Sequence, residues 1–430
     1  MTLFFTSDKR LQVAFAVLLP LAILLLNPLA ANAAANKNAA LSLAEAINKT
    51  FQHNPDLASF QFQNKAQQGR LVQAGLSAKP EVTLMLEDAL GDGDLKGFDS
   101  AQTTLSVNWV LEQALRQKRT QVAMANQGLI DSDKSIKQLD VATQTARYFL
   151  QTLAHQESAL LADKAIYLAD AMVKETKKRT NSGKASLAEL YRAEAELAQR
   201  QLIREDSKHE IDAAIRLLAA QWGETAPMFT EVAGQLTLAE KIISFEELKQ
   251  QLNNNLGLHR FLSLQRIKEA ELKLAEEQKD PMWRIQTGLR HDQSTGDYSL
   301  IAGLSVPFGG SNQNQGRIAE VSAQLEQQHV ETTALRIRLE TALFVYYKKL
   351  EHSQHVAEIL SKNVIPRLEK ALSESRKAYE SGKYSYLELK VLQTELLDAQ
   401  LNLLENSLAS QLNKIEIERL TGVQITTPDQ

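Results

Sequence analysis

The chain has 430 residues, of which 44% are apolar and 23% are charged, and it contains no cysteine. This composition excludes a collagen-like chain, a disulfide-rich scaffold and a wholly disordered protein. The formal net charge of −4 gives no support to nucleic acid as a partner. Proline and glycine are scarce and long stretches are rich in Ala, Leu, Glu, Gln and Lys, so we expect long helices.

Residues 1–33 have the three regions of a secretory signal peptide. Lys9 and Arg10 precede an apolar run over residues 11–26, and the small residues 31–33 follow it. The alternative is a membrane-anchoring helix, but the run is shorter than the roughly 20 residues that a spanning helix needs. We therefore expect export, with a mature chain that starts near Ala34.

The sequence contains an internal repeat. Residues 181–190 match residues 380–389 at an offset of 199, and residues 105–107 match residues 304–306 at the same offset. Asn54, Leu57 and Phe60 match Asn255, Leu258 and Phe261 at an offset of 201. Two separate matches at one offset indicate a duplication rather than coincidence among Leu- and Glu-rich helices. We expect a first repeat at 34–222, a linker at 223–244, a second repeat at 245–422 and a tail at 423–430.

Each repeat is expected to contain a helix, two strands, a long helix and a final helix. The expected ranges are 55–78, 80–90, 100–111, 116–180 and 186–222 in the first repeat, and 257–279, 282–291, 298–308, 313–381 and 385–420 in the second. At about 1.5 Å per residue each long helix reaches roughly 100 Å, which only a rod or tube accommodates. An ordinary soluble coiled coil explains the helices equally well, but not the strands or the signal peptide.

The expected strands alternate apolar and polar residues. Leu105, Val107 and Trp109 alternate with Ser106 and Asn108, so that one face of the strand is apolar and the other is polar. Each run has about 10 residues, the length of a tilted membrane-spanning strand. Alternation alone fits a small soluble sheet equally well.

Aromatic residues stand near the ends of these runs, where a membrane-interface belt is expected: Trp109, Trp283 and Phe308. Four strands cannot close into a barrel, and unpaired strand edges in hydrocarbon are costly. If the strands enter a bilayer, several chains must share one barrel, and two, three or four copies would give eight, twelve or sixteen strands.

The repeated motif predicts two tight turns between antiparallel helices. Ser186 and Glu189 have the spacing of a capping box, and Gly183 can end the preceding helix in the left-handed conformation. Their counterparts in the second repeat are Ser385, Glu388 and Gly382.

Residues that could carry chemistry are few. His352, His355 and Glu358 could hold a metal on one helix face, but solvated helix residues are the favoured interpretation. The chain has neither a phosphate-binding loop nor a nucleophile elbow. We therefore expect no enzyme activity, no cofactor and no bound metal.

The order of these features resembles the TolC family of outer membrane efflux proteins. The similarity covers residues 41–423, and the segments 41–46, 54–57, 305–310 and 316–319 are most similar to the CzcC-type heavy-metal branch. The resemblance implies long helical hairpins that form a periplasmic tube, with four membrane strands per chain in a trimeric 12-stranded barrel. It also implies a homotrimer in the outer membrane, in contact with its lipid, that works with a periplasmic adaptor and an inner-membrane pump of the RND type.

In that family the helix tips contact the adaptor and constrict the pore. The resemblance therefore gives Gly183, Ser186, Glu189, Gly382, Ser385 and Glu388 as gate or docking candidates, with Lys184, Lys383 and Tyr384 as exposed docking contacts. Arg192 and Val391 stand where certain family members have a further acid, which argues against a carboxylate ring. Export of heavy-metal cations is the favoured function. Export of drugs or organic compounds is the alternative, followed by a soluble periplasmic coiled-coil adaptor.

Overall fold

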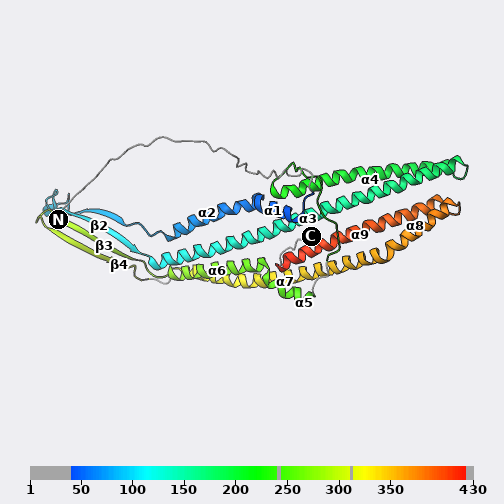
Figure 1. The fold of residues 1–430 in the computed structure, drawn as a ribbon. Helices are drawn as coiled ribbons and strands as arrows, with labels where there is room; N and C mark the ends of the chain where they lie inside the picture. The colour runs from blue at the N-terminus through cyan, green and yellow to red at the C-terminus, as the bar shows by residue number, and fades with distance from the viewer. Residues whose placement is uncertain (1–39, 240–243, 310–312, 423–430) are drawn as a thin grey trace, which may run out of the picture. The chain divides into compact units, whose positions relative to one another are not determined.

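The structure is a computed structural model that describes residues 40–239, 244–309 and 313–422. The predicted signal peptide (1–33) and C-terminal tail (423–430) lie outside the described residues. The helices are α1 (Leu43–His53), α2 (Pro55–Gly75), α3 (Gln113–Asn181), α4 (Leu187–Ala219), α5 (Phe245–Gln251), α6 (Leu256–Glu277), α7 (Gln315–Ile359), α8 (Ile365–Glu380) and α9 (Tyr386–Thr421). The strands are β1 (Glu81–Glu87), β2 (Gln102–Leu111), β3 (Trp283–Asp292) and β4 (Tyr298–Ser305), and Figure 1 shows these elements.

The structure confirms the predicted sequence of helices and strands, with three differences. The helices α1 and α5 were not predicted. The helix predicted over 313–381 is interrupted by a π-helical turn at Leu360–Val364. The strand predicted over 298–308 ends at Ser305, so Phe308 follows it rather than belonging to it. The fold is thus mainly helical with one small antiparallel sheet.

Long helices pack side by side in both halves of the chain. The 69 residues of α3 span roughly 100 Å. Along its length α3 contacts α2, α4, α6 and α9, and α7 contacts both α6 and α9 (Figure 1). The shorter helices α2 and α4 thus both line the long helix α3, and α6 and α9 both line α7.

An asparagine joins these shorter helices end to end. The side-chain oxygen of Asn54 accepts hydrogen bonds from the first turn of α2, and its Nδ2 donates to the carbonyl of Gln221 at 2.7 Å, just beyond α4. Asn255 repeats the arrangement: it caps α6, and its Nδ2 donates to the carbonyl of Leu420 at the end of α9, at 2.8 Å. Each junction thus satisfies polar groups at two helix ends with one side chain.

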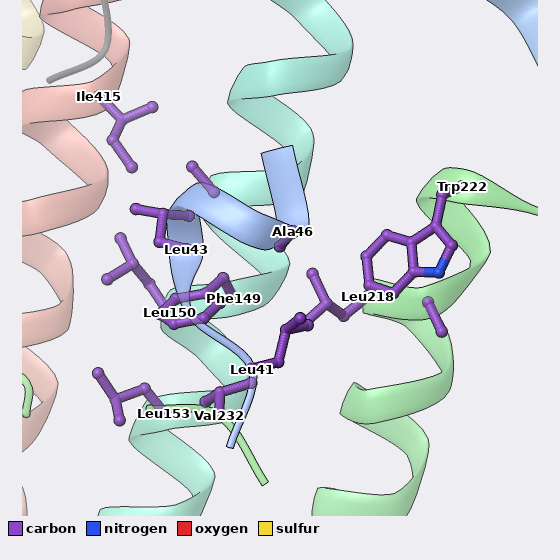
Figure 2. Close-up of a cluster of buried hydrophobic side chains, with 12 residues drawn as sticks. Leu41, Leu43, Ala46, Phe149, Leu150, Leu153, Leu218, Trp222, Val232 and Ile415 are labelled. Carbon is purple, nitrogen blue, oxygen red and sulfur yellow. The ribbon is translucent and has the colours of Figure 1, made fainter. Parts of the chain in front are cut away.

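The first hydrophobic cluster packs α1 against α3 and the end of α4. Figure 2 shows Leu43 and Ala46 facing Phe149 and Leu150 of α3. The other labelled members are Leu41, Leu153, Leu218, Trp222, Val232 and Ile415. The helix α1 is therefore part of the core, and its capping box between Ser42 and Glu45 fixes its start.

The segment expected as a linker contributes to this core. Val232 is buried, and its backbone N–H donates to Oε1 of Gln156 at 2.8 Å. Further along, the N–H of Ala239 donates to the hydroxyl of Ser410 on α9 at 3.1 Å. Ala239 packs in a second cluster together with α5, α7 and α9. The segment therefore fastens the two halves of the chain together rather than only connecting them.

The sheet is antiparallel with strand order β1-β2-β3-β4, so the central pair β2–β3 joins the two halves. Its register places Leu84, Leu105, Leu289 and Leu300 in one row across the four strands. Leu84 is 70% and Leu300 84% exposed, whereas the side chains of Thr104 and Ser106 on the other face are buried. The apolar face of the sheet is therefore the uncovered one.

The polar face of the sheet is held by side-chain hydrogen bonds. Nε2 of Gln286 donates to the hydroxyl of Ser106 at 2.9 Å. Arg290 donates to the hydroxyl of Thr104 at 3.0 Å and forms an ion pair with Glu87 at 2.9 Å. These contacts account for the burial of polar groups on a sheet whose apolar side is exposed.

The π turn before α8 is related to Pro366. Proline has no N–H to donate to the carbonyl four residues earlier, and a wide turn takes up the lost bond. Arg367 donates to the carbonyl of Asn363 within the turn, at 2.9 Å. Among the described residues, no helix is long and apolar enough to cross a membrane.

The close approach of β2 and β3 gives a first prediction. A Cβ at Gly288 would lie 2.5 Å from the carbonyl oxygen of Leu105 and 2.7 Å from Cβ of Ser106, whereas one at Gly303 would lie 3.3 Å from the movable Oε1 of Gln286 and at an ordinary 3.5 Å from its Cβ. We expect Gly288→Ala to destabilise the sheet by about 1–3 kcal/mol and Gly303→Ala to change it little. Thermal unfolding in detergent, followed by circular dichroism, measures both, and equal midpoints for the two variants would contradict the register.

Candidate functional site

The first helix hairpin, α3 and α4, ends in the predicted tight turn. Gly183 has a φ of 72°, and the N–H of Lys184 donates to the carbonyl of Arg179 at 2.8 Å. This is the glycine-ended helix stop that the sequence predicts. The hydroxyl of Ser186 accepts from the N–H of Glu189 at 3.2 Å and so caps α4.

The capping box predicted here is only half formed, which corrects the sequence analysis. No hydrogen bond from the N–H of Ser186 to the carboxylate of Glu189 is present among the described residues. Ser186 is therefore a helix cap bonded to the backbone of Glu189, while the carboxylate of Glu189, which is half-buried, does not take part in the cap.

The second hairpin, α8 and α9, ends in the same turn with a complete capping box. Gly382 has a φ of 76°. The carboxylate of Glu388 accepts from the N–H and the hydroxyl of Ser385 at 2.8 and 2.7 Å, and the hydroxyl of Ser385 accepts from the N–H of Glu388 at 3.3 Å. The hydrogen bonds from Ser385 lower the pKa of Glu388 below its ordinary value of 4.5.

The two tips contact each other through Tyr379. Its side chain is 1% exposed, and its hydroxyl lies 3.2 Å from the hydroxyl of Thr176 on α3. The guanidinium of Arg179 stands 4.2 Å from the centre of the Tyr379 ring and donates to the Tyr379 carbonyl. Met172, Ala193, Tyr386 and Leu389 complete this cluster between the hairpins.

An ion-pair network joins the hairpins above the tips. The carboxylate of Glu196 on α4 pairs with Arg200 at 2.7 Å and with Lys390 on α9 at 2.7 Å. Burial acts to raise the pKa of Glu196, but the hydrogen bonds and charges of Lys390 and Arg200 together outweigh it and lower the pKa. Burial also raises the pKa of the neighbouring Tyr386.

The predicted docking residues are placed at the two turns. Lys184 and Lys383 are exposed and Tyr384 is half-buried, packed against the cluster around Tyr379. The sequence analysis did not identify Arg179, Tyr379, Glu196 or Lys390. These residues connect the two hairpins, and a pairing between distant segments leaves no local pattern in the sequence.

The three predicted interface aromatics lie at one end of the sheet. Trp109 and Trp283 are on the uncovered apolar face, 39% and 49% exposed, and Phe308 follows β4 at the same end. The opposite end of that face carries Tyr298, which is 71% exposed and stacks on His291 with ring centres 4.5 Å apart. The nine residues from Trp283 to His291, eight steps along the strand, span about 27 Å of β3.

The described residues contain no group of three or more His, Asp or Glu side chains that could hold a metal ion. His352 and His355 are exposed, and the carboxylate of Glu358 pairs with Lys362 at 2.7 Å. This agrees with solvated helix residues, the favoured interpretation of that motif.

The comparisons with known proteins confirm the resemblance found in the sequence. The chain is 24% identical over 366 residues to the cobalt-zinc-cadmium resistance protein CzcC of Cupriavidus metallidurans. The matched region covers 85% of this chain and 86% of that protein. No model of a protein family matches the sequence.

Solved outer membrane channels have the same fold. A crystal structure of CusC, from work on its folding and transmembrane channel formation, is similar to this one. The TM-score is 0.72 and the identity 14%, over 88% of this chain and 92% of that one. The outer membrane protein VceC of Vibrio cholerae matches with a TM-score of 0.70 and 16% identity over 89% and 95%. The outer-membrane channel OprN matches with a TM-score of 0.70 and 15% identity over 88% and 89%.

The Glu388 cap gives a pH prediction. Because its pKa is lower in the folded protein, the cap stabilises α9 above the unfolded pKa and loses this contribution as the pH falls through the folded value. We expect the stability difference between the wild type and Glu388→Gln to shrink between neutral pH and pH of about 3. Urea unfolding across this range measures it, with Ser385→Ala as a variant that removes the same contact. A difference that stays constant with pH would contradict the assignment.

Proposed function

We propose that this protein is the outer membrane channel of a tripartite efflux system and forms a passive exit duct from the periplasm to the exterior. The observation that carries the proposal is the inverted sheet: its polar face is hydrogen-bonded and its apolar face is uncovered. Aromatic side chains stand at both ends of that face, and the span of about 27 Å between them is close to the roughly 25 Å apolar band of membrane barrels. The fold shared with outer membrane channels supports the same conclusion.

The sheet supports an oligomer, and the resemblance to outer membrane efflux proteins favours three copies. Among the described residues, β1 and β4 pair on one side only, which leaves two open edges. Open edges are not tolerated in hydrocarbon, so further copies must complete the sheet. Three copies would form a barrel of twelve strands, continued into the periplasm by the long helices.

We further propose that the chain arose by duplication. The order of two helices, two strands, a long helix and a hairpin partner occurs once in residues 40–222 and again in residues 244–422. The matching asparagine junctions at Asn54 and Asn255 support this interpretation. The expected boundaries at 222 and 245 fall between the two sets of elements, and the linker packs against both.

The helix tips are the proposed gate and docking site. Gly183 and Gly382 shape the two turns, Ser186 and Ser385 cap the helices after them, and Tyr379 joins the tips. With the sheet in the outer membrane, these turns lie about 100 Å away from it along α3, within reach of a periplasmic adaptor and an RND-type pump. Lys184, Lys383 and Tyr384 are the proposed docking contacts.

The proposed cargo is heavy-metal cations. Similarity to CzcC, named for resistance to cobalt, zinc and cadmium, supports this choice. A duct needs neither a metal site nor a catalytic centre, because the pump selects and drives the cargo. Drugs or organic compounds are the alternative cargo. A soluble adaptor is a weaker alternative, because a soluble sheet would cover its apolar face.

The lipid-facing assignment predicts the effect of a charge on each face of β2. Leu105→Arg would place a cation in hydrocarbon at a cost of about 2–4 kcal/mol, whereas Asn108→Arg adds one on the polar face opposite Glu81. We expect Leu105→Arg to lose the heat-sensitive trimer from the outer membrane fraction and Asn108→Arg to keep it. Semi-native gels of separated membranes measure this. A soluble periplasmic monomer for the wild type would overturn the duct.

The cargo is tested by deletion of the gene. We expect the deletion strain to become at least about tenfold more sensitive to zinc, cobalt or cadmium, with hydrophobic drugs little affected and plasmid-borne wild type restoring growth. Minimal inhibitory concentrations measure both classes of compound. Increased sensitivity to drugs alone would replace the metal assignment by the alternative.

A further inference from the structure

The two hairpin tips share three positively charged positions, two of which form ion pairs in one hairpin and, within the described chain, none in the other. At the offset of 199, Lys177, Lys178 and Lys184 of the first hairpin correspond to Arg376, Lys377 and Lys383 of the second. In the second hairpin Lys377 pairs with Glu374 at 2.7 Å and Arg376 pairs with Glu380 at 3.5 Å.

The first hairpin lacks these ion pairs. Asn181 stands at the position that corresponds to Glu380, and Glu175, which corresponds to Glu374, is half-buried. Within the described part of the chain, Lys177, Lys178 and Lys184 form no ion pair, and all three are exposed. Of these three corresponding positions in the described chain, all are therefore unpaired in the first hairpin, and only Lys383 is unpaired in the second.

These lysines point away from the second hairpin. Met172, Thr176 and Arg179 of α3 face that hairpin, at the spacing of one helix face. At 100° per residue, Lys177 and Lys178 lie on the opposite side. The charge is therefore directed outward, where no other part of the described chain covers it.

We propose that the tip of the first hairpin binds a carboxylate-rich surface of a separate periplasmic protein through Lys177, Lys178 and Lys184, and that the second tip, where Arg376 and Lys377 are already paired, adds little to this electrostatic contact. The proposal rests on the function proposed above and specifies the chemistry of the docking partner. A second copy of this chain does not fit, because the acids near its second tip are engaged: Glu374 and Glu380 in ion pairs, and Glu388 in its cap.

The test uses the full chain in detergent and two synthetic helical hairpins that differ only at the turn, with four Glu or four Lys. We expect the Glu hairpin to bind roughly tenfold more tightly, since each exposed ion pair contributes a small factor, and to bind more weakly as salt rises. Fluorescence anisotropy measures the Kd.

Matched variants separate the two tips. Lys178→Glu, and Asn181→Glu, which supplies the acid present in the second hairpin, should each weaken binding by about threefold or more. Lys377→Glu, at the position of the second tip that corresponds to Lys178, should leave the Kd unchanged. Equal weakening by Lys178→Glu and Lys377→Glu, or equal binding of both hairpins, would overturn the proposal. So would lysine-dependent binding to phosphatidylglycerol vesicles without binding of the Glu hairpin.

A conductance measurement in planar bilayers keeps the two proposals apart. If the protein conducts ions but does not bind the Glu hairpin, the proposal of an acidic partner is wrong and the duct function is unaffected. Selective binding of the Glu hairpin by a protein that conducts no ions would support the partner and overturn the duct.

Discussion

The fold depends on one side-chain contact made twice, in which an asparagine joins the start of one helix to the end of another. Asn54 and Asn255 each cap a helix and donate to a carbonyl at the end of the helix that approaches it. Two helices of ordinary length thereby act as one long partner for α3 or for α7 and α8. Without such a junction the polar ends of four helices would interrupt the packing midway along the long helices.

The sheet, whose apolar face is uncovered, restricts the environment in which the chain can be stable. Its polar face is internally satisfied, as the Arg290 contacts to Thr104 and Glu87 show. Its apolar face requires an apolar environment. A chain with this sheet at one end of its long helices and charged turns at the other is suited to two different surroundings, and the helices keep them about 100 Å apart.

The elements that the sequence predicted are those with long or repeated patterns. The period of α3, the alternation in β2 and the two Gly-x-x-Ser turns are local, so they could be identified without a structure. The short helices α1 and α5 also carried a signal, since Ser42 and Ser244 begin capping boxes identical in spacing to that of Ser385. The contacts of Arg179 with Tyr379 and of Glu196 with Lys390 cross between the two hairpins, and nothing in either segment specifies its partner. The buried part of the linker was missed because its core residues lack a period.

The π turn before Pro366 shifts the helical periodicity of α8 relative to α7, whereas α3 keeps one periodicity along its whole length. A π turn contains one more residue than the α-helical turn it replaces, which rotates every later side chain of that helix by about 100° relative to an uninterrupted α-helix. A helical wheel drawn through residues 315–380 therefore assigns the residues of α8 to the wrong face, whereas one drawn along α3 does not. Tyr379, which contacts Thr176 of the first hairpin, lies beyond this turn, so the side of α8 that meets the first hairpin is the one placed by the rotated phase.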